Sequence, residues 1–340
     1  MTYNIIMGKI LCLGSAGKDI FFPTDEGKII DTPEDITAQK KIAFELGAKI
    51  KVKDRHESLG GCAANIATAL SKLGVESVCV STVGGDATGD WICEELKKNK
   101  VGADLISVEK DKKSDMSAII VDAKSADRVI FTSRTSSGEL KLEAEKTKIA
   151  DWFFVSDIHG KWEESLEKIF ELAKAENKKV AFNPREAGIQ EDAAEIIEAI
   201  GLCEVVFVNK DEAIEIVSHM EKEIDPKNLN DEKFLLEKLF SLEPKMVALT
   251  DGLRGAWAYD GKNVLYVPAQ KVPAVDSTGA GDSFSSGFLA AYIKGKDMGE
   301  CLQWGIVLSS SVVQHYGAIE GLLKEEEILE KIKDIKVEKI

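Results

Sequence analysis

A run of small residues that ends in an acidic residue, DSTGAGD at residues 276–282, lies between a strand-like segment and an apolar helical segment. Gly279, Ala280 and Gly281 can expose consecutive backbone N–H groups at the start of that helix, where free donors and the helix dipole favour negative charge. Asp282 follows them directly. Phosphoryl transfer needs donors that hold the γ-phosphoryl group and a carboxylate that accepts the proton of the attacking hydroxyl. The segment therefore predicts a phosphotransfer site, although an Asp in the first turn of a helix is also common for electrostatic reasons alone.

Regularly alternating segments must position this site. Short apolar runs predict strands at residues 10–14, 77–81, 152–155, 179–182, 205–208 and 246–249. Apolar residues at helical spacing predict helices near residues 63–73, 86–98, 162–175, 191–200, 211–219, 232–239, 281–293 and 298–315. Strands that alternate with helices of about ten residues are typical of βαβ units. The sequence therefore predicts an α/β fold with a mostly parallel sheet.

Two separated segments, 19–58 and 113–135, differ from this pattern. In the first, residues 32–44 read as a helix that begins at Thr-Pro-Glu, and residues 49–53 alternate as a half-exposed strand does. In the second, two alternating runs flank a turn and predict a hairpin. We therefore predict one domain over residues 1–340, with a small β-rich lid built from these two insertions.

The composition argues against several classes of protein. The 340 residues are 44% hydrophobic and 30% charged, which is typical of a globular protein. The net charge of −15 disfavours binding to nucleic acid and to anionic membranes. No apolar run reaches the roughly 18 residues of a membrane span, and the first residues lack the pattern of a secretion signal. Six scattered cysteines without paired spacing fit a reducing compartment, so we expect a cytoplasmic protein with no nucleic-acid or membrane partner.

Four short motifs are spread along the chain. They are GGCAANIA at residues 60–67, NKDE at 209–212, TDGLRG at 250–255 and DSTGAGDSFSSGF at 276–288. In this order they resemble the two signatures of the PfkB carbohydrate kinases, the ribokinase-like family, and its intervening NxxE and TxGxxG motifs. The resemblance covers essentially the whole chain. It implies a ribokinase-like three-layer sandwich, with helices on both sides of a mostly parallel sheet, and an ATP-dependent kinase that phosphorylates a hydroxyl of a sugar.

The resemblance also implies roles for the matching residues on the ATP side. Asp282 would be the catalytic base, and the amides of residues 279–281 would form the anion hole. The nucleotide would lie against Asn209, Thr250, Gly252, Arg254, Gly255 and Gly281. Arg254 would contact a phosphate, although a solvated surface arginine is an equal alternative.

Two cation sites follow from the same resemblance. Asn209 and Glu212 would position Mg²⁺ through its waters, which suits an ion that prefers oxygen ligands. The same two residues also read as a helix capping box. Some members of the family use a monovalent cation, and the candidates to hold K⁺ here are Asp276 and the carbonyl of Thr278.

The acceptor side has six candidate residues: Asp19, Gly60, Gly61, Asn65, Arg134 and Asn183. The carboxylate of Asp19 can accept hydrogen bonds from two hydroxyls, the glycines let the backbone approach a sugar closely, and the Asn65 amide both donates and accepts. Arg134 follows the predicted hairpin, and Asn183 ends a predicted strand, where open α/β sheets bind ligands. A buried structural amide at Asn65 and a structural ion pair at Arg134 are the simpler alternatives.

The residues leave the acceptor itself open. A nucleoside kinase shares every motif and differs in the base pocket, for which Phe21, Phe22 and Phe131 offer aromatic faces unless they form the core of the lid. A sugar phosphate is a third acceptor, and its phosphate could be bound by basic residues: Lys18, Arg55, Arg134 and Arg185. Cys62 and Ala63 stand where ribokinases proper often have Lys-Gly, which argues against ribose.

Two other classes of protein are disfavoured by the sequence, and a homodimer is expected. A sugar sensor that has lost its chemistry is disfavoured because Asp282 and the full glycine string are retained. A NAD-binding oxidoreductase fails because no GxGxxG follows the first strand. The alternating run at residues 117–121 offers a sheet edge, so we predict a homodimer through the lid.

Overall fold

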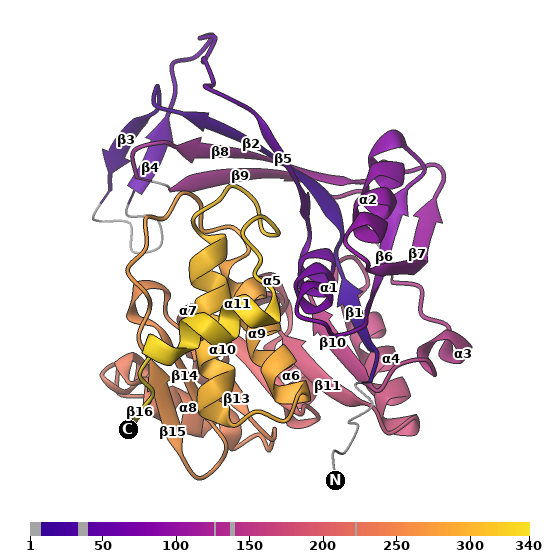
Figure 1. Ribbon diagram of the computed structural model, residues 1–340, viewed down its shortest axis with the longest axis vertical. Coiled ribbons are helices and arrows are strands. Elements are labelled where there is room, and N and C mark those ends of the chain that lie inside the picture. Colours follow the sequence, from indigo (N-terminus) through magenta and orange to yellow (C-terminus); the bar gives the residue numbers. More distant parts are fainter. Residues whose placement is uncertain (1–7, 33–39, 126, 137–139, 222) are drawn as a thin grey trace.

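A ten-stranded sheet forms the centre of the molecule, and helices cover both of its faces (Figure 1). The computed structural model describes residues 8–32, 40–125, 127–136, 140–221 and 223–340. The strands of this sheet are β1 (Ile10–Gly14), β6 (Ser77–Gly84), β7 (Gly102–Glu109), β10 (Trp152–Ser156), β11 (Lys179–Asn183), β12 (Val205–Asn209), β13 (Val247–Thr250), β14 (Ala256–Tyr259), β15 (Val264–Val267) and β16 (Glu338–Lys339).

The strand order is β16-β15-β14-β13-β12-β11-β10-β1-β6-β7. All pairs from β7 to β13 are parallel, and β14, β15 and β16 add antiparallel strands at one edge. The first strand of the chain, β1, lies between β6 and β10. The chain therefore proceeds in opposite directions from β1, and such a switch point leaves a crevice at the carboxyl ends of the strands.

Two hydrophobic cores lie on opposite faces of this sheet. Along β1, Ile10 and Cys12 belong to one core, whereas Leu11 and Leu13 belong to the other, as the two-residue repeat of a strand requires. The helices of the first core are α1 (Cys62–Lys72), α2 (Ala87–Lys98), α9 (Ala280–Ile293), α10 (Met298–Val312) and α11 (Glu325–Lys331). Those of the second are α4 (Trp162–Ala175), α5 (Glu186–Glu191), α6 (Ala193–Gly201), α7 (Lys210–Met220) and α8 (Glu232–Phe240).

These two helical layers and the sheet confirm the predicted three-layer α/β fold. A short helix α3 (Ala144–Thr147) and the 3₁₀ turns η1 (Asn228–Asn230), η2 (Gly252–Arg254) and η3 (Ile332–Asp334) complete the helical elements of the described ranges. None of the helices in those ranges has the length and apolar character needed to cross a membrane.

A second, four-stranded sheet crosses the top of the molecule in the order β5-β2-β8-β9 (Figure 1). We call this sheet the lid: its strands are β2 (Gly17–Thr24), β5 (His56–Gly60), β8 (Asp115–Asp122) and β9 (Arg128–Ser133). The predicted hairpin is present, because β8 and β9 pair antiparallel. A separate small hairpin joins β3 (Lys28–Asp31) to β4 (Lys40–Ala43).

Two predictions in the first lid segment are wrong. Residues 40–43 form strand β4 instead of the end of a helix, and residues 33–39 of that prediction lie outside the described residues. Residues 49–53 form no strand. The N–H of Lys51 donates to the side chain of Glu26 at 3.3 Å, and its carbonyl accepts from the hydroxyl of Thr24 at 3.1 Å. The N–H of Lys53 also donates to the Pro23 carbonyl of β2 at 3.2 Å, so the segment is held by side-chain contacts and this backbone bond without forming a strand.

Candidate active site

The loop after β1 anchors the start of helix α1. The carbonyl of Ser15 accepts from the N–H groups of Ala63 and Ala64 at 3.1 and 3.3 Å, and its hydroxyl accepts from the N–H of Cys62 at 3.1 Å. Gly61 caps the helix at φ 87°, and a Cβ there would lie 2.6 Å from the Ser15 carbonyl oxygen. Glycine is therefore required at this position, and the contact fixes the first turn of α1 at the crevice beside β1.

Asp282 and Asn65 meet across the interface of α9 and α1. The Nδ2 of Asn65 donates to the Oδ2 of Asp282 at 2.9 Å. Burial above all raises the pKa of the Asp282 carboxyl to about 6. Hydrogen bonds with Asn65 and Cys62 oppose this shift, and the negative charges of Asp157 and Asp19 add to it. A carboxylate tuned towards neutral pH is suited to accept a proton.

The start of α9 presents unused backbone donors. Gly279 has φ 74°, and a Cβ there would lie 2.2 Å from the Cβ of Ala318. The N–H of Ala280 donates to the Ser277 carbonyl at 3.3 Å, whereas those of Gly281 and Asp282 donate to no other described residue. Nothing described lies within 4 Å of a Cβ placed on Gly281. Open donors at the N-terminus of a 14-residue helix can hold an anion.

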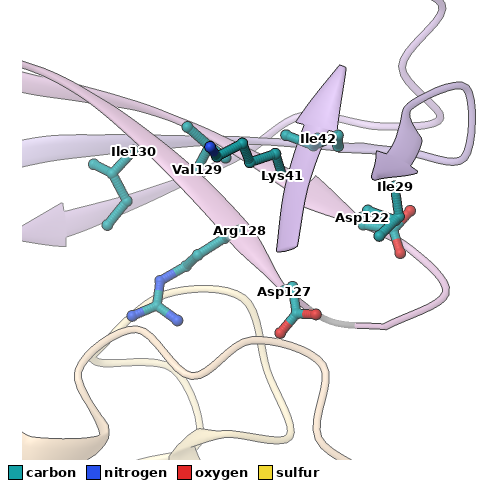
Figure 2. A pocket seen from close by; sticks show the side chains of 8 residues that line it. All are labelled: Ile29, Lys41, Ile42, Asp122, Asp127, Arg128, Val129 and Ile130. Atoms are coloured by element: carbon teal, nitrogen blue, oxygen red, sulfur yellow. The ribbon is translucent and has the colours of Figure 1, made fainter. Parts of the chain in front are cut away.

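Arg128 of the lid reaches the loop before α9. Its Nη1 donates to the hydroxyl of Ser277, and its Nε lies 3.9 Å from the Oδ1 of Asp276. In Figure 2, Arg128 points from β9 towards this loop, and it lines a cavity of about 610 Å³ bounded by the lid and the small hairpin. Arg128 was not predicted, because its only signal in the sequence is a basic residue at the start of a predicted strand.

Asp276 is fully buried and holds the same loop in shape. Its Oδ1 accepts from the N–H and the hydroxyl of Thr278 at 3.0 and 2.8 Å, and its Oδ2 accepts from the N–H of Gly317 at 3.3 Å. Asp276 and Thr278, the two residues predicted to lie beside a monovalent cation, are therefore in contact with each other. The described residues show no group of three or more His, Cys, Asp or Glu side chains arranged to hold a metal directly.

Asp19 and Gly60, two of the predicted acceptor-side residues, lie against each other. They lie on the paired strands β2 and β5, and a Cβ on Gly60 would lie 2.4 Å from the Asp19 carboxyl carbon. Burial raises the pKa of Asp19 to about 6, and the charge of Asp276 adds to that shift. A hydrogen bond with Ser117 lowers it. Asp19 as a whole is buried, with 7% of its surface exposed.

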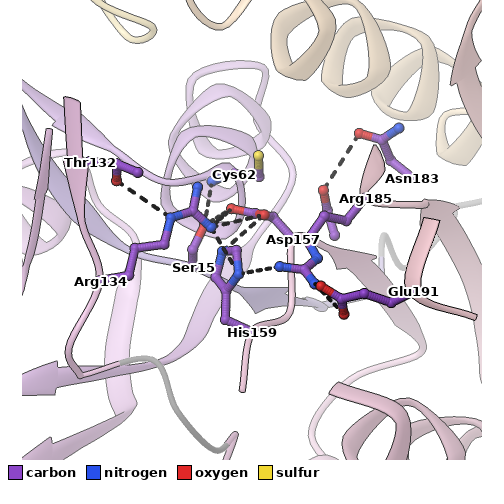
Figure 3. Close-up of polar contacts among 10 residues, drawn as sticks. Ser15, Cys62, Thr132, Arg134, Asp157, His159, Asn183, Arg185 and Glu191 are labelled. Carbon is purple, nitrogen blue, oxygen red and sulfur yellow. Dashed lines mark hydrogen bonds and ion pairs between the residues drawn. The ribbon is translucent and has the colours of Figure 1, made fainter. Parts of the chain in front are cut away.

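A polar cluster lies where β1, β10 and β11 end (Figure 3). We call it the arginine cluster: its members are Ser15, Arg134, Asp157, His159, Arg185 and Glu191. Asp157 has φ 50°, accepts from the hydroxyl of Ser15 at 2.6 Å and lies 2.9 Å from the Nε2 of His159. Burial opposes ionisation of Asp157, but the contacts with His159, Arg134 and Ser15 together outweigh burial and lower its pKa to about 2.

Asp157 and His159 were not predicted, whereas Arg134 and Asn183 were. Both missed residues follow a predicted strand, and that position was the only signal for them. Arg134 belongs to the cluster. Asn183 instead binds neighbouring strands: its Nδ2 donates to the Phe207 carbonyl at 2.9 Å.

On the predicted ATP side, Asn209 and Glu212 form a capping box at the start of α7. The Asn209 side chain accepts from the N–H of Glu212 at 2.8 Å, and the Glu212 carboxylate accepts from the N–H of Asn209 at 2.9 Å. Burial raises the pKa of Glu212 to about 7. The structure thus contains the cap that was the simpler interpretation of these residues.

The turn between β13 and β14 carries the other predicted nucleotide residues. Thr250 ends β13, Gly252 has φ 44°, and Gly255 has φ 111°. A Cβ on Gly255 would lie 2.3 Å from the Val267 carbonyl oxygen. Arg254 pairs with Glu232 at 2.7 Å and with Asp251 at 3.0 Å, so it belongs to a surface ion network.

The three phenylalanines proposed for a base pocket differ in exposure, and Phe22 is half-buried on β2. Phe21 is fully buried and packs with Ile119, Val121 and Tyr316 in the core of the lid, whereas Phe131 is 62% exposed on β9. Phe21 therefore belongs to the core of the lid, which was the simpler alternative, and has no open face for a base.

The fold and the site together define a kinase of the ribokinase fold. The nucleoside kinase of Methanocaldococcus jannaschii, described as an archaeal member of the ribokinase family, matches with a TM-score of 0.72 and 24% identity over 96% of this chain and 98% of that one. Residues 34–325 match the pfkB family carbohydrate kinases. The chain therefore belongs to the pfkB family and is an ATP-dependent kinase, which confirms the resemblance found in its motifs.

The names of similar proteins refer to different phosphoryl acceptors. A nucleoside kinase of Methanothermobacter thermautotrophicus is 26% identical over 76% of this chain and 79% of its own length. An ATP-dependent 6-phosphofructokinase of Thermoanaerobacterium thermosaccharolyticum is 27% identical over 83% of this chain and 87% of its own length. Similarity therefore identifies the class of enzyme, and the acceptor must be argued from the site.

Proposed function

We propose that this kinase transfers the γ-phosphoryl group of ATP to a hydroxyl of a sugar, with Asp282 as the base. The observation that carries the proposal is the half-buried Asp282 carboxylate, whose pKa is raised to about 6, directly beside the open amides at the start of α9. The acceptor oxygen bonds to the γ-phosphorus as the bond to the β–γ bridging oxygen breaks and releases ADP. The proton of the acceptor hydroxyl passes to Asp282.

Asn65 and the anion hole orient this transfer. The Asn65 amide holds one oxygen of Asp282, and its own Oδ1 is buried with no partner among the described residues. A buried acceptor without a partner invites a ligand hydroxyl. The amides of residues 279–281 would stabilise charge on the phosphoryl oxygens. The N–H of Ala280 is the least available of them, because it already donates to the Ser277 carbonyl at 3.3 Å. Asp19, beside Gly60 and Gly61, would bind other hydroxyls of the sugar.

Asn209 and Glu212 would hold the waters of Mg²⁺ near the phosphates of ATP. The fit rests on the charges around Glu212: beyond burial, Glu186, Asp211 and Glu215 raise its pKa, so a cation nearby would relieve their repulsion. When bound, Mg²⁺ neutralises charge on the phosphates. Thr250, Gly252 and Gly255 would shape the turn against the nucleotide, and Arg254 would contact a phosphate only by leaving its ion network.

Asp276 and the Thr278 carbonyl would lie beside a K⁺ ion. The fully buried Asp276 carboxylate is paired with neutral donors and with the Arg128 Nε at 3.9 Å, so its charge is only partly compensated. A larger rise in melting temperature with KCl than with equal choline chloride would support this site. Equal rises would contradict it.

The lid would close one domain and join two copies of it in a cytoplasmic homodimer. The predicted edge at residues 117–121 is wrong, because β8 pairs with β2 on one side and with β9 on the other. The edge strand is β9, which exposes three consecutive apolar residues: Val129, Ile130 and Phe131. Such an edge is normally covered. Light scattering should give twice the 37.1 kDa mass, and Phe131→Lys should halve it. A monomeric wild type would contradict the homodimer.

The test of the function is ADP release with ATP and Mg²⁺ over a panel of sugars, sugar acids, sugar phosphates and nucleosides. We expect turnover with a sugar-type acceptor that Asp282→Asn lowers by roughly a hundredfold or more. Turnover with nucleosides alone would establish the nucleoside kinase alternative, for which the buried Phe21 offers no support. Binding of an acceptor without any turnover would indicate a sensor and contradict the proposal.

A further inference from the structure

Two guanidinium groups converge on one imidazole nitrogen in the arginine cluster. The Nη1 of Arg134 lies 2.9 Å from the Nδ1 of His159, and the Nη1 of Arg185 lies 2.8 Å from the same atom. Figure 3 shows the two arginines on either side of His159. A neutral imidazole nitrogen offers one lone pair, so a single acceptor serves two cations that repel each other. The side chains described here supply fewer acceptors than these arginines need.

The remaining donors of both arginines confirm this shortage. The Nη2 of Arg185 binds Glu191 at 3.0 and 3.1 Å, but its Nε is buried with no partner among the described residues. Arg134 reaches Asp157 only at 3.3 and 3.4 Å and the Thr132 hydroxyl, through its Nε, at 3.4 Å, and its Nη2 donates to no other described residue. A buried guanidinium nitrogen without a partner is costly unless something else binds there.

The acids of the cluster orient the arginines more than they neutralise them. The shortest contacts of Asp157 are with the Ser15 hydroxyl at 2.6 Å and with the Nε2 of His159 at 2.9 Å. Glu191 is half-exposed, so water screens its charge, and it also accepts from the indole of Trp162 at 2.6 Å. Both acids therefore fix the guanidinium planes and leave donors for a further anion.

The cluster is joined to the catalytic centre by a short chain of contacts. Asp157 binds the Ser15 hydroxyl, and that hydroxyl accepts from the N–H of Cys62, in the first turn of the helix that carries Asn65. The negative charge of Asp157 also contributes to the raised pKa of Asp282. Arg134 comes from the end of the lid strand β9, and Arg185 follows β11. The contacts of Asp157 and Ser15 therefore link the cluster to the first turn of the helix that holds Asp282 through Asn65.

We propose that Arg134 and Arg185 bind an anionic group of the acceptor, so that the substrate is a sugar carrying a carboxylate or a phosphate instead of a neutral sugar. This inference rests on the proposed kinase function and names its substrate class. The planar, forked donors of arginine match both groups, and two arginines can hold one anion from two sides. An anion would take over the donors that now share His159 and the buried Nε of Arg185. Arg134 would also connect the lid to the bound substrate.

The test compares acceptors that differ in the anion: glucitol with gluconate for the carboxylate, and fructose with fructose 6-phosphate for the phosphate. Steady-state ADP release gives kcat and KM, and calorimetry on Asp282→Asn with ADP gives the affinity without turnover. We expect one anionic member to exceed its neutral partner in kcat/KM on the order of a hundredfold. Which member does so distinguishes a sugar acid from a sugar phosphate.

Three variants assign the effect to the cluster. Arg134→Met and Arg185→Met should each raise KM for the anionic acceptor by roughly thirtyfold or more, with kcat nearly unchanged. Arg134 is 39% exposed, so its variant tests the inference even if Arg185→Met fails to fold. Lys161→Met, which removes an exposed cation two residues from His159, is the matched control and should change neither constant.

The outcomes separate this inference from the kinase function. Equal use of neutral and anionic acceptors, unchanged in the arginine variants, would overturn the inference and leave the kinase function intact. Anion binding that the arginine variants abolish, without any ADP release, would contradict the kinase function and support the anion site. Absence of any binding by the four acceptors would overturn the inference.

Discussion

The two sides of the crevice are built from different chemical groups. The phosphoryl side is mostly backbone: the open N–H groups at the start of α9, held by Gly279 in a left-handed conformation. The acceptor side is made of side chains from the lid, β10 and β11, with several charges in contact. Backbone donors suit a phosphate that is the same in every turnover, whereas side chains can be exchanged to select a new acceptor.

The difference also concerns what each side can tolerate. Gly281 has open space around it, whereas Gly60 packs its backbone against the Asp19 carboxylate. The backbone at Gly281 is therefore open, and the backbone at Gly60 is tightly packed. Changes on the first side should act on the chemical step, and changes on the second on acceptor binding.

Asp282→Asn tests the phosphoryl side with the largest expected effect. Without a base, kcat should fall by roughly a hundredfold or more, while the Kd of the acceptor changes little. Steady-state kinetics and calorimetry measure the two quantities. A variant that keeps its kcat would show that Asp282 is not the base.

The pH profile of kcat/KM should fall on the acid side of about pH 6. Asp282 must be ionised to accept a proton, and burial raises its pKa to about 6. The limb should lose about tenfold or more per pH unit, since Asp19 titrates in the same range. A profile that stays flat down to pH 4.5 would contradict the assignment.

Stability should show the opposite dependence on pH. A carboxyl whose pKa is higher in the folded than in the unfolded state stabilises the fold at low pH, and this contribution is lost as pH rises through about 6. Asp282→Asn should therefore raise the melting temperature more at pH 8 than at pH 5. Thermal denaturation at the two pH values measures the difference. An equal effect at both pH values would argue against a raised pKa of the Asp282 carboxyl.

Gly60→Ala and Gly281→Ala separate packing from chemistry. A Cβ on Gly60 meets the Asp19 carboxylate at 2.4 Å, so this variant should raise acceptor KM by roughly tenfold and lose about 1–3 kcal/mol of stability. Gly281→Ala should keep its stability, because a Cβ there contacts nothing described, and should lower kcat instead. The same change in both variants would remove the distinction between the two sides.

Arg254→Met should have the smallest effect. Arg254 is about half exposed and already pairs with Glu232 and Asp251, so its loss should raise KM for ATP by no more than about threefold. Initial rates over a range of ATP concentrations measure this. A rise of tenfold or more would place Arg254 directly on the nucleotide.

The phosphoryl side could be predicted from the sequence because one continuous motif contains it. Asp282 and Gly279 are three residues apart, so their relation follows from helix geometry. The strand and helix rhythm of the central fold was predictable for the same local reason. The lid was harder, because segment 49–53 bonds to side chains of Thr24 and Glu26 that no local pattern reveals.

The acceptor side could be predicted only in part. Arg134 was found from its place after a hairpin, but its contact with His159 joins residues from the lid and from β10, which sequence spacing does not relate. Arg128 was missed in the same way, because Ser277 lies far along the chain. Contacts of this kind depend on tertiary packing, and they are the ones that distinguish acceptors.

The most direct test of the two-sided account is the division between kcat and KM in two variants measured with the same acceptor. Asp282→Asn should lower kcat by roughly a hundredfold and leave acceptor binding intact, whereas Arg185→Met should raise acceptor KM and leave kcat nearly unchanged. If both variants lower kcat and weaken acceptor binding alike, the two sides are not separate and the account is wrong.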